Sequence, residues 1–255
     1  MIYTLNKHIK WRKDKNNIFI CDCKRLIDLK LELKFEDFMV KINKGIDPKE
    51  LNEIDRLIFS DFKKLNLLSL LEIRPVKKNE LLKSFEILDR NIRKRQRNNN
   101  FLLNKFKRFP NLFIGLFLNN EIIGIIFGFP REDYLLVSEV TVDNKFQKRG
   151  FGTKLINYFE RIARENYYHK INVGARDNAI NFYKHLDYTP SLLIQYLKKD
   201  YSVKDFHEMD IIHVKLDKEY QILDVKSNKT DLINLEHLRK IFPKAHFQYI
   251  FTKDI

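Results

Sequence analysis

The chain has 255 residues, of which 44% are hydrophobic and 32% charged, and it carries a formal net charge of +14 at pH 7. This composition excludes a disordered chain, no apolar stretch approaches the ~20 residues of a membrane helix, and the polar first residues exclude a signal peptide, so we expect a cytoplasmic protein with no membrane partner. The positive charge favours phosphorylated cofactors, acidic peptides or nucleic acid, but the lysines are dispersed and do not by themselves select a nucleic-acid partner.

The first segment, residues 1–66, is expected to form a small module of strands followed by helices. Apolar and polar residues alternate, as in half-buried strands, over three runs: residues 8–12, 17–23 and 25–33. Two helical runs follow, at residues 35–43 and 48–65. Asp47 before Pro48 is a typical start for the second helix.

The chain has two cysteines, Cys21 and Cys23. A structural zinc site needs four ligands, and the sequence offers no second cysteine pair, so no metal site is predicted. Disulfides are rare in the cytosol. We therefore expect two reduced thiols whose side chains point to opposite faces of a strand.

The second segment, residues 67–217, mixes strands and helices in the order βααβββαβαββ. An amphipathic helix is expected at residues 80–97, because Leu81, Phe85, Leu88 and Ile92 recur on one face. The expected strands are residues 68–76, 111–118, 121–129, 135–142, 170–175, 191–197 and 209–216. The other expected helices are residues 101–109, 153–166 and 178–186. This order predicts an α/β domain.

The third segment, residues 218–255, is expected to form a strand at residues 220–225, a helix at residues 232–242 and a strand at residues 246–252. It contains no chemical motif. We interpret this β-α-β extension as a structural cap or a dimer contact, which leaves a homodimer open.

Residues 140–153, VTVDNKFQKRGFGT, form the most informative stretch of the sequence. A strand ends, a loop follows, and Gly150 and Gly152 open the next helix. Glycine lets the backbone approach a ligand, and the free N–H groups at a helix N-terminus point at an anion. Lys148 and Arg149 add positive charge, so the sequence predicts a pyrophosphate site. The stretch is neither a P-loop nor a dinucleotide fingerprint, since it lacks G-K-S/T and a third glycine.

This loop resembles the Q/R-x-x-G-x-G/A coenzyme A loop of the GNAT family of N-acetyltransferases. The later segment ARDNAINFYKHLDY is similar to that family's A-R-x-x-A-x-x-F-Y-x-x-L-G-F/Y, with Asp187 in place of the usual glycine, and HEMDIIHVKL resembles its last strand. The likeness covers about residues 67–217. It implies a GNAT fold, in which helices flank a mixed, mostly antiparallel sheet, and an enzyme that moves an acyl group from acetyl-CoA or another acyl-CoA to an amine.

The resemblance assigns the cofactor-binding residues. The main chain of Val140 and Val142 would pair with the pantetheine arm, and Asn178 would bond it. Seven residues would surround the pyrophosphate with backbone N–H groups: Gln147, Lys148, Arg149, Gly150, Phe151, Gly152 and Thr153.

The resemblance also assigns three catalytic roles. Val140 N–H would polarise the thioester carbonyl. Tyr183 matches the family's tyrosine near the coenzyme A sulfur, where a phenol can protonate a departing thiolate; the alternative is an aromatic side chain packed beside Phe182. Glu139, on the fourth strand, would take a proton from the amine directly or through water; the alternative is an exposed strand glutamate.

Residues 90–108 form a basic run without a single acidic residue. In the GNAT family, the turn between the first two helices borders the acceptor site, so this run could gather an acidic acceptor or the anionic cofactor. A solvated loop is the alternative, because runs of like charge usually face water.

The first segment resembles a RiPP recognition element, a winged-helix domain of the pyrroloquinoline-quinone chaperone type that binds the leader of a ribosomally made precursor peptide. His8, Trp11 and Arg12, the three-strand start and the glycine-punctuated helix pair carry the likeness. It implies that the leader adds a strand at the edge formed by residues 26–33 and meets the helix at residues 51–65. The implied peptide-binding residues are Leu26, Leu29, Leu31, Ile58 and Phe62.

Three classes of function stay open. The first is an acyltransferase that modifies an amine of a leader-bearing precursor peptide. The second is an acetyltransferase for another protein amine or a small-molecule amine, with the first segment only structural. The third is a non-catalytic nucleic-acid-binding protein, which leaves the loop at residues 147–152 without a role, so nucleic acid is not the expected partner.

Overall fold

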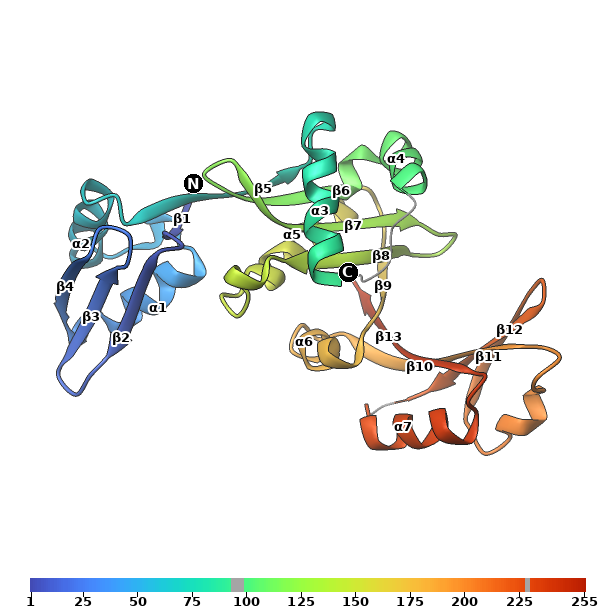
Figure 1. The fold of residues 1–255 in the computed structure, drawn as a ribbon. Coiled ribbons are helices and arrows are strands. Elements are labelled where there is room, and N and C mark those ends of the chain that lie inside the picture. The colour runs from blue at the N-terminus through green and yellow to red at the C-terminus, as the bar shows by residue number, and fades with distance from the viewer. Residues whose placement is uncertain (93–98, 228–229) are drawn as a thin grey trace. The chain divides into compact units, whose positions relative to one another are not determined.

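The computed structural model describes residues 1–92, 99–227 and 230–255 (Figure 1). These residues form two compact units: unit 1 comprises Met1–Phe127 and Glu139–Phe159, and unit 2 comprises Gly128–Ser138 and Glu160–Ile255. Three elements contribute residues to both units: β7 (Glu121–Pro130), β8 (Leu135–Val142) and α5 (Phe151–Glu165). None of the helices in the described ranges is both long and apolar enough to cross a membrane.

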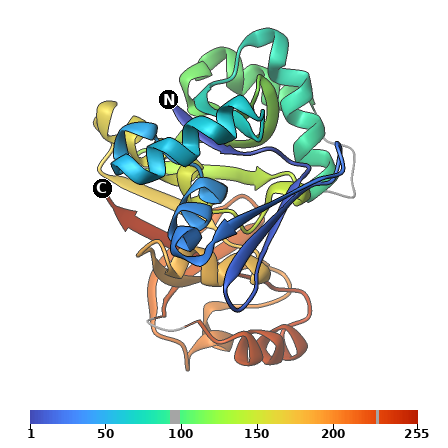
Figure 2. The ribbon, with the colours of Figure 1, turned by 90° about the vertical axis from the view of Figure 1, so that its left-hand side faces the viewer.

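The N-terminal part of unit 1 contains a three-stranded antiparallel sheet in the order β2-β3-β4. Its strands are β2 (Ile9–Lys13), β3 (Asn17–Asp22) and β4 (Ile27–Glu32). Helices α1 (Glu36–Lys44) and α2 (Glu53–Lys64) follow, and both views show them on the same side of this sheet (Figures 1 and 2). The expected order of three strands and two helices is confirmed.

One apolar core holds this N-terminal module together. Alternation along β3 sends Ile18 and Ile20 inward, where they are 0% and 1% exposed. Phe38 of α1 meets Phe62 of α2 edge-on, with ring centroids 5.5 Å apart. Full burial of a side chain of this size stabilises a fold by about 1.5–3 kcal/mol. Phe62 is 3% exposed, so it belongs to the core and offers no surface to a peptide.

Helix α2 begins later than the sequence predicts. Asp47 does cap a helix, but that helix is a short 3-10 turn, Pro48–Glu50. Leu51 then adopts an extended conformation and is 4% exposed, so the chain leaves the helical path to bury it. The side chain of Asn52 caps α2 itself.

The sequence does not predict strand β1 (Ile2–Leu5), which pairs antiparallel with β5 (Leu68–Pro75). Four residues are too few to show a hydrophobic period, and the pairing partner lies far along the chain. The register joins Leu5 to Leu68 and Ile2 to Leu71. β1 therefore ties the N-terminal module to the next sheet of unit 1.

That sheet runs in the order β1-β5-β6-β7-β8. Strand β6 (Phe113–Leu118) is buried at every position, as its continuous apolar run predicts. Asn119 and Asn120 turn the chain from β6 into β7 with φ angles of 49° and 67°, the left-handed values that a tight hairpin needs. Helices α3 (Leu81–Ile92) and α4 (Asn99–Arg108) complete unit 1.

Helix α3 buries the predicted face. Leu81, Phe85 and Leu88 are 1%, 2% and 0% exposed. The side chain of the fourth expected position, Ile92, and the end of the predicted helix fall outside the described residues. Residues 93–98, in the middle of the basic run, fall outside them as well.

Unit 2 contains a sheet in the order β8-β9-β13-β10-β12-β11. Its further strands are β9 (Lys170–Gly174), β10 (Thr189–Leu197), β11 (Ile211–Asp217), β12 (Tyr220–Lys226) and β13 (His246–Asp254). Its further helices are α6 (Ile180–Lys184) and α7 (Leu232–Ile241). The predicted ranges overlap every one of these elements. Asp187, after α6, adopts the left-handed conformation expected of it, with φ 61°.

The C-terminal strand β13 is a central strand of this sheet. It pairs antiparallel with β9 on one side and with β10 on the other. Phe247 and Phe251 of β13 are 1% and 0% exposed. The third segment is therefore built into the core of unit 2, whereas β11 lies at the end of the sheet.

Candidate active site

The loop between β8 and α5 is held by hydrogen bonds to the end of β8. Gln147 Nε2 donates to the carbonyl oxygen of Val142 at 2.9 Å and to Asn144 Oδ1 at 2.8 Å. Asp143 accepts from Lys145 N at 3.1 Å and caps the short turn of helix between strand and loop. These bonds are local in sequence, which explains why the motif alone predicts the loop.

Two loop residues adopt a left-handed backbone conformation: Lys148 with φ 61° and Gly150 with φ 76°. A Cβ atom at Gly150 would meet no heavy atom within 4 Å. Glycine is therefore favoured there by the backbone angle, and the space above it is open to a ligand. Helix α5 begins at Phe151, so its first N–H groups have no carbonyl partner one turn earlier. Such helix starts bind phosphate groups.

Arg149 places a positive charge in the same loop. Its Nη1 atom is buried and has no hydrogen-bond partner among the described residues. Burial lowers the pKa of this guanidinium, whose carbon lies 5.7 Å from the ring centroid of Phe146. An unsatisfied buried donor costs about 1–3 kcal/mol, and a bound anion would remove that cost. The residues present therefore fit a phosphorylated ligand.

The strand before the loop pairs with β9 over only part of its length. β9 pairs with β8 only over residues 135–137 of β8. The main chain of Val140 and Val142 thus has no partner in β9 within the described part of the chain. Glu139 and Val140 are half-buried, and Val142 is buried. An extended ligand can add to such an edge as a further strand.

Tyr183 lies on α6 in unit 2, within a cluster of aromatic rings. Its ring centroid is 5.1 Å from that of Phe182, 5.8 Å from that of Tyr188 and 5.5 Å from that of Phe251. The side chain is 4% exposed, and burial raises the pKa of its phenol above the ordinary value. A raised pKa keeps the hydroxyl protonated, as a proton donor requires, although the burial fits the packed-aromatic alternative equally well.

A buried acidic side chain braces this cluster. Tyr188 donates its hydroxyl hydrogen to Glu160 Oε1 at 3.0 Å, and Lys253 Nζ lies 3.1 Å from the same oxygen. Glu160 is 4% exposed, and Lys253 and Arg164, the latter 3.8 Å from Oε2, compensate its charge in place of water. Sequence reasoning missed Glu160; the signal was an acid on the apolar face of α5, four residues after Ile156.

Asn178 is exposed, in the short helix Asp177–Ala179 that precedes α6. Its neighbour Asp177 accepts two hydrogen bonds from the guanidinium of Arg239 on α7, at 2.7 and 3.1 Å. This bidentate pair lowers the pKa of Asp177 and anchors the segment. Asn178 is thereby presented on a fixed turn.

The predicted residues are distributed over both units. Unit 1 holds Glu139, Val140, Val142 and the loop at residues 147–153, and unit 2 holds Tyr183 and Asn178. Residues 78–188, which include all of them, match the model of the acetyltransferase (GNAT) family. This segment is a GNAT acetyltransferase domain. The GNAT match confirms the predicted α/β fold class and the predicted class of enzyme, an N-acyltransferase.

Solved structures of acetyltransferases resemble the chain at low identity. Ard1 from Thermoplasma volcanium is 18% identical, with a TM-score of 0.46, over 61% of this chain and 96% of its own. A GNAT family acetyltransferase from Elizabethkingia anophelis, solved with acetyl-CoA bound, is 14% identical, with a TM-score of 0.44, over 72% of this chain and 98% of its own. At such TM-scores these likenesses add nothing to the GNAT assignment. No curated protein matches the sequence.

The N-terminal module has a second candidate surface, on β4 and α2. β4 ends the small sheet, so its outer edge has no strand partner among the residues described. Ile54 and Leu57 of α2 are 60% and 70% exposed, and Leu26, just before β4, is 86% exposed. Three predicted peptide-binding residues are partly buried against the module's core: Leu29, Leu31 and Ile58. We call these six residues the β4–α2 surface.

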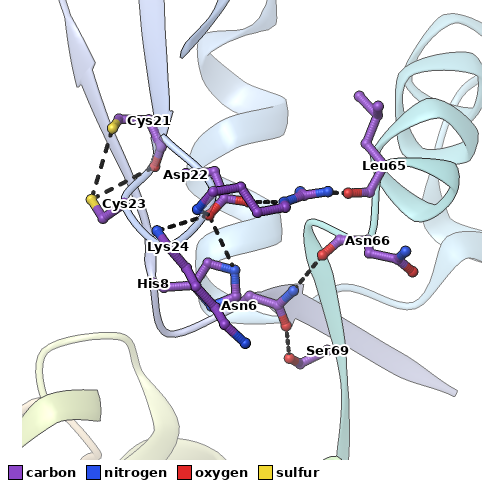
Figure 3. A network of polar contacts seen from close by, with 10 residues as sticks. Asn6, His8, Cys21, Asp22, Cys23, Lys24, Leu65, Asn66 and Ser69 are labelled. Atoms are coloured by element: carbon purple, nitrogen blue, oxygen red, sulfur yellow. Dashed lines mark hydrogen bonds and ion pairs between the residues drawn. The ribbon is translucent and has the colours of Figure 1, made fainter. Parts of the chain in front are cut away.

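A polar network joins the start of β4 to the end of α2 (Figure 3). Asp22, 1% exposed, accepts hydrogen bonds from the backbone N–H groups of Lys24 and Arg25, each at 3.0 Å, and from the guanidinium of Arg25. Arg25 Nη2 also donates to the carbonyl oxygen of Leu65 at 2.6 Å. Burial raises the pKa of Asp22, but the hydrogen bonds from Arg25 outweigh it, and the pKa is lowered. The network thus fixes both sides of the β4–α2 surface.

Cys21 and Cys23 lie beside this network, and the prediction that they point apart is wrong. Their Sγ atoms are 3.8 Å apart (Figure 3), because residues two apart along a strand share a face. A hydrogen bond with Asp28 raises the pKa of Cys21 to about 11, which keeps that thiol protonated. Over the described ranges, no group of three or more metal-ligating side chains comes together.

Proposed function

We propose that this chain is an acyl-CoA-dependent N-acyltransferase. The loop at residues 147–153 carries the proposal. The left-handed Gly150, the open space above it, the start of α5 and the buried Nη1 of Arg149, which has no hydrogen-bond partner among the described residues, together suit a pyrophosphate. The GNAT match over residues 78–188 supports the same chemistry. Acyl-CoA supplies the thioester whose acyl group is transferred to an amine.

Each residue of the proposed site has a binding or proton-transfer role. The backbone N–H groups at residues 147–153 hold the phosphates, and Asn178 bonds the pantetheine. Val140 N–H donates to the carbonyl oxygen while negative charge develops there. Glu139 accepts a proton from the amine, whose nitrogen bonds the carbonyl carbon. Tyr183 donates its proton to the sulfur as the carbon–sulfur bond breaks, so the products are an amide and a thiol.

The purified full-length chain tests this proposal. Mass spectrometry after gentle release of bound ligand is expected to detect coenzyme A or an acyl-CoA. With acetyl-CoA and a panel of peptide and polyamine amines, one thiol is expected to appear for each amide formed. Thiol release at the uncatalysed rate, with every acyl-CoA and amine tried, would refute an acyltransferase.

We further infer that the N-terminal module recruits a precursor peptide through the β4–α2 surface. A leader added along β4 would gain main-chain hydrogen bonds and bring its apolar side chains against Ile54 and Leu57. Ile54 and Leu57 are three residues apart on α2 and therefore lie on one face of that helix, and exposed apolar side chains that lie together are typical of binding surfaces. Phe62 is in the core, so the anchoring role predicted for it passes to Leu57.

Substitutions on α2 test recruitment without touching the transferase domain. Leu57→Asp is expected to weaken binding of a fluorescent leader peptide, taken from a neighbouring short reading frame, at least tenfold in anisotropy titrations. Ile233→Asp is the matched control, because Ile233 is 84% exposed on α7. Equal leader affinity in the two variants would favour the other acceptors, a protein or small-molecule amine, with the module only structural.

A further inference from the structure

A turn of defined geometry ends helix α6 and joins Tyr183 to Tyr188. The backbone N–H of Tyr188 donates to the carbonyl oxygen of Tyr183 at 3.2 Å, and that of Asp187 donates to the carbonyl oxygen of Lys184 at 3.2 Å. With Asp187 left-handed at φ 61°, these two bonds form a Schellman motif, in which the side chains at the two ends commonly pack together. The rings of Tyr183 and Tyr188 do so, with centroids 5.8 Å apart. The position of Tyr188 therefore helps to set the position of Tyr183.

The hydroxyl group of Tyr188 is anchored to Glu160 on helix α5. It donates to Glu160 Oε1 at 3.0 Å, and each of the two side chains is 4% exposed. A buried polar group that loses its hydrogen-bond partner destabilises the fold, because water cannot replace that partner. The bond therefore holds the ring of Tyr188 in one orientation against Tyr183.

Strand β13 fixes both Glu160 and Tyr183. Lys253 Nζ donates to the two carboxylate oxygens of Glu160, at 3.1 and 3.2 Å. Phe251 lies two residues earlier on β13 and therefore on the same face of the strand. Its ring centroid is 5.5 Å from that of Tyr183. Since β13 is paired with a neighbouring strand on each side, the cation beside Glu160 and the ring beside Tyr183 share one rigid support.

We propose that Glu160 and Tyr188 are positioning residues for Tyr183. Glu160, held by Lys253, fixes the ring of Tyr188, and that ring holds the hydroxyl group of Tyr183 where the thiolate departs. This inference rests on the proposed function, in which Tyr183 gives its proton to the coenzyme A sulfur. A proton donor acts only within hydrogen-bond reach of its acceptor, so a small displacement of Tyr183 would slow the reaction without weakening the binding of acyl-CoA.

Tyr188→Phe in the full-length chain tests the positioning role, because it keeps the ring and removes only the hydroxyl group. In steady-state thiol release, kcat is expected to fall about tenfold while KM for acetyl-CoA stays within about twofold. Tyr196→Phe is the matched control, since Tyr196 is 1% exposed and its hydroxyl donates to Gln221 Oε1 at 3.0 Å in the same unit. Both variants lose one hydrogen bond from a buried tyrosine and are expected to lose similar stability, so only kcat separates them.

A double substitution tests whether Tyr188 acts through Tyr183. Adding Tyr188→Phe to Tyr183→Phe is expected to lower kcat no further, because the hydroxyl group to be positioned is already absent. A second pair of variants tests Glu160. Glu160→Gln keeps an oxygen for the hydroxyl of Tyr188 and Glu160→Leu removes it, so kcat is expected to be higher for Glu160→Gln at a similar KM.

The outcomes separate this inference from the proposed function. An unchanged enzyme that releases no thiol would refute both. In an active enzyme that Tyr183→Phe slows, a Tyr188→Phe variant as fast as Tyr196→Phe would overturn the positioning role alone. The same holds if Tyr188→Phe lowers kcat by an equal factor with and without the Tyr183 hydroxyl, or if the two Glu160 variants have equal kcat. An active enzyme that Tyr183→Phe does not slow would also overturn it and leave the acyltransferase standing.

Discussion

Tyr183 is the residue whose proposed role depends most on its surroundings. Tyr183→Phe keeps the ring packed against Phe251 and Tyr188 and removes only the hydroxyl group. If the phenol donates a proton to the departing thiolate, kcat is expected to fall about ten- to a thousandfold with little change in KM. Steady-state thiol release measures this, with Tyr167→Phe, 86% exposed, as the control. An unchanged kcat would show that Tyr183 only packs.

The pH profile gives a second test of Tyr183. Burial raises the pKa of the phenol, so it holds its proton beyond the pH at which an exposed tyrosine loses it. The rate of the unchanged enzyme is therefore expected to show no loss from this group as pH rises toward ~10, the ordinary value for tyrosine. A fall in kcat near neutral pH that disappears in Tyr183→Phe would contradict a buried, protonated donor.

Glu139 is tested by removing its charge alone. Glu139→Gln is expected to slow the reaction most at low pH, where the neutral amine is scarcest and a base is most needed. The measurement is kcat/KM from pH 6 to 9, with Glu132→Gln in the exposed β7–β8 turn as the control. Parallel profiles for both variants would assign the proton transfer to water or to another residue.

At the residue scale, the sequence predicted the local conformation of the loop and failed where burial decides, while the roles of the predicted site residues stay predictions. The motif from Gln147 to Gly152 identified the loop because its hydrogen bonds and backbone angles depend on near neighbours. The sequence could not show that Phe62 packs into a core against α1, nor that Glu160 is compensated by Lys253, because those partners are distant in sequence.

Among the elements, the turn that leads into α3 offers a test of how an ion pair stabilises the start of a helix. Arg74 donates two hydrogen bonds to Glu80, at 2.9 and 2.8 Å, and Lys77 N donates a third at 2.9 Å. The bond from Arg74 is the main reason that the pKa of Glu80 is lowered to about 2 from 4.5. A lowered pKa means that this stabilisation is present above pH 4.5 and is lost as pH falls toward 2.

Glu80→Gln is therefore expected to lower the free energy of unfolding at neutral pH by about 1 kcal/mol. The difference from the unchanged protein is expected to shrink steadily between pH 4.5 and 2, the span of the Glu80 shift. Urea titrations at several pH values measure it, with the exposed Glu86→Gln as the control. A difference that grew on acidification would mean that Glu80 is not the stabilised carboxylate.

The elements also show where sequence patterns stop being informative. The sequence predicts the bounds of β8 without error. The pairing of β1 with β5, and the place of β13 between β9 and β10, depend on contacts between distant segments. Because β1 belongs to the sheet of unit 1, deleting residues 1–65 would also remove a strand, so substitutions test the N-terminal module better than truncation.

At the scale of the whole molecule, the chain is given two ligands: a leader peptide at the β4–α2 surface and acyl-CoA at the loop of residues 147–153. The two proposals use different residues. Leu57→Asp is expected to leave the affinity for coenzyme A unchanged, and Gly152→Glu is expected to leave the leader affinity unchanged. Calorimetry and anisotropy on the same two variants measure both affinities. A single substitution that abolished both would show that the two sites are coupled.

The central claim is that the loop at residues 147–153 binds the pyrophosphate of coenzyme A, and calorimetric titration of the full-length chain with coenzyme A tests it most directly. The unchanged protein is expected to bind one equivalent. Gly152→Glu, which places a carboxylate at the start of α5, is expected to abolish binding, while Lys199→Gln, which alters net charge equally at an exposed position in unit 2, is expected to bind normally. A folded Gly152→Glu variant with unchanged affinity would contradict the assignment.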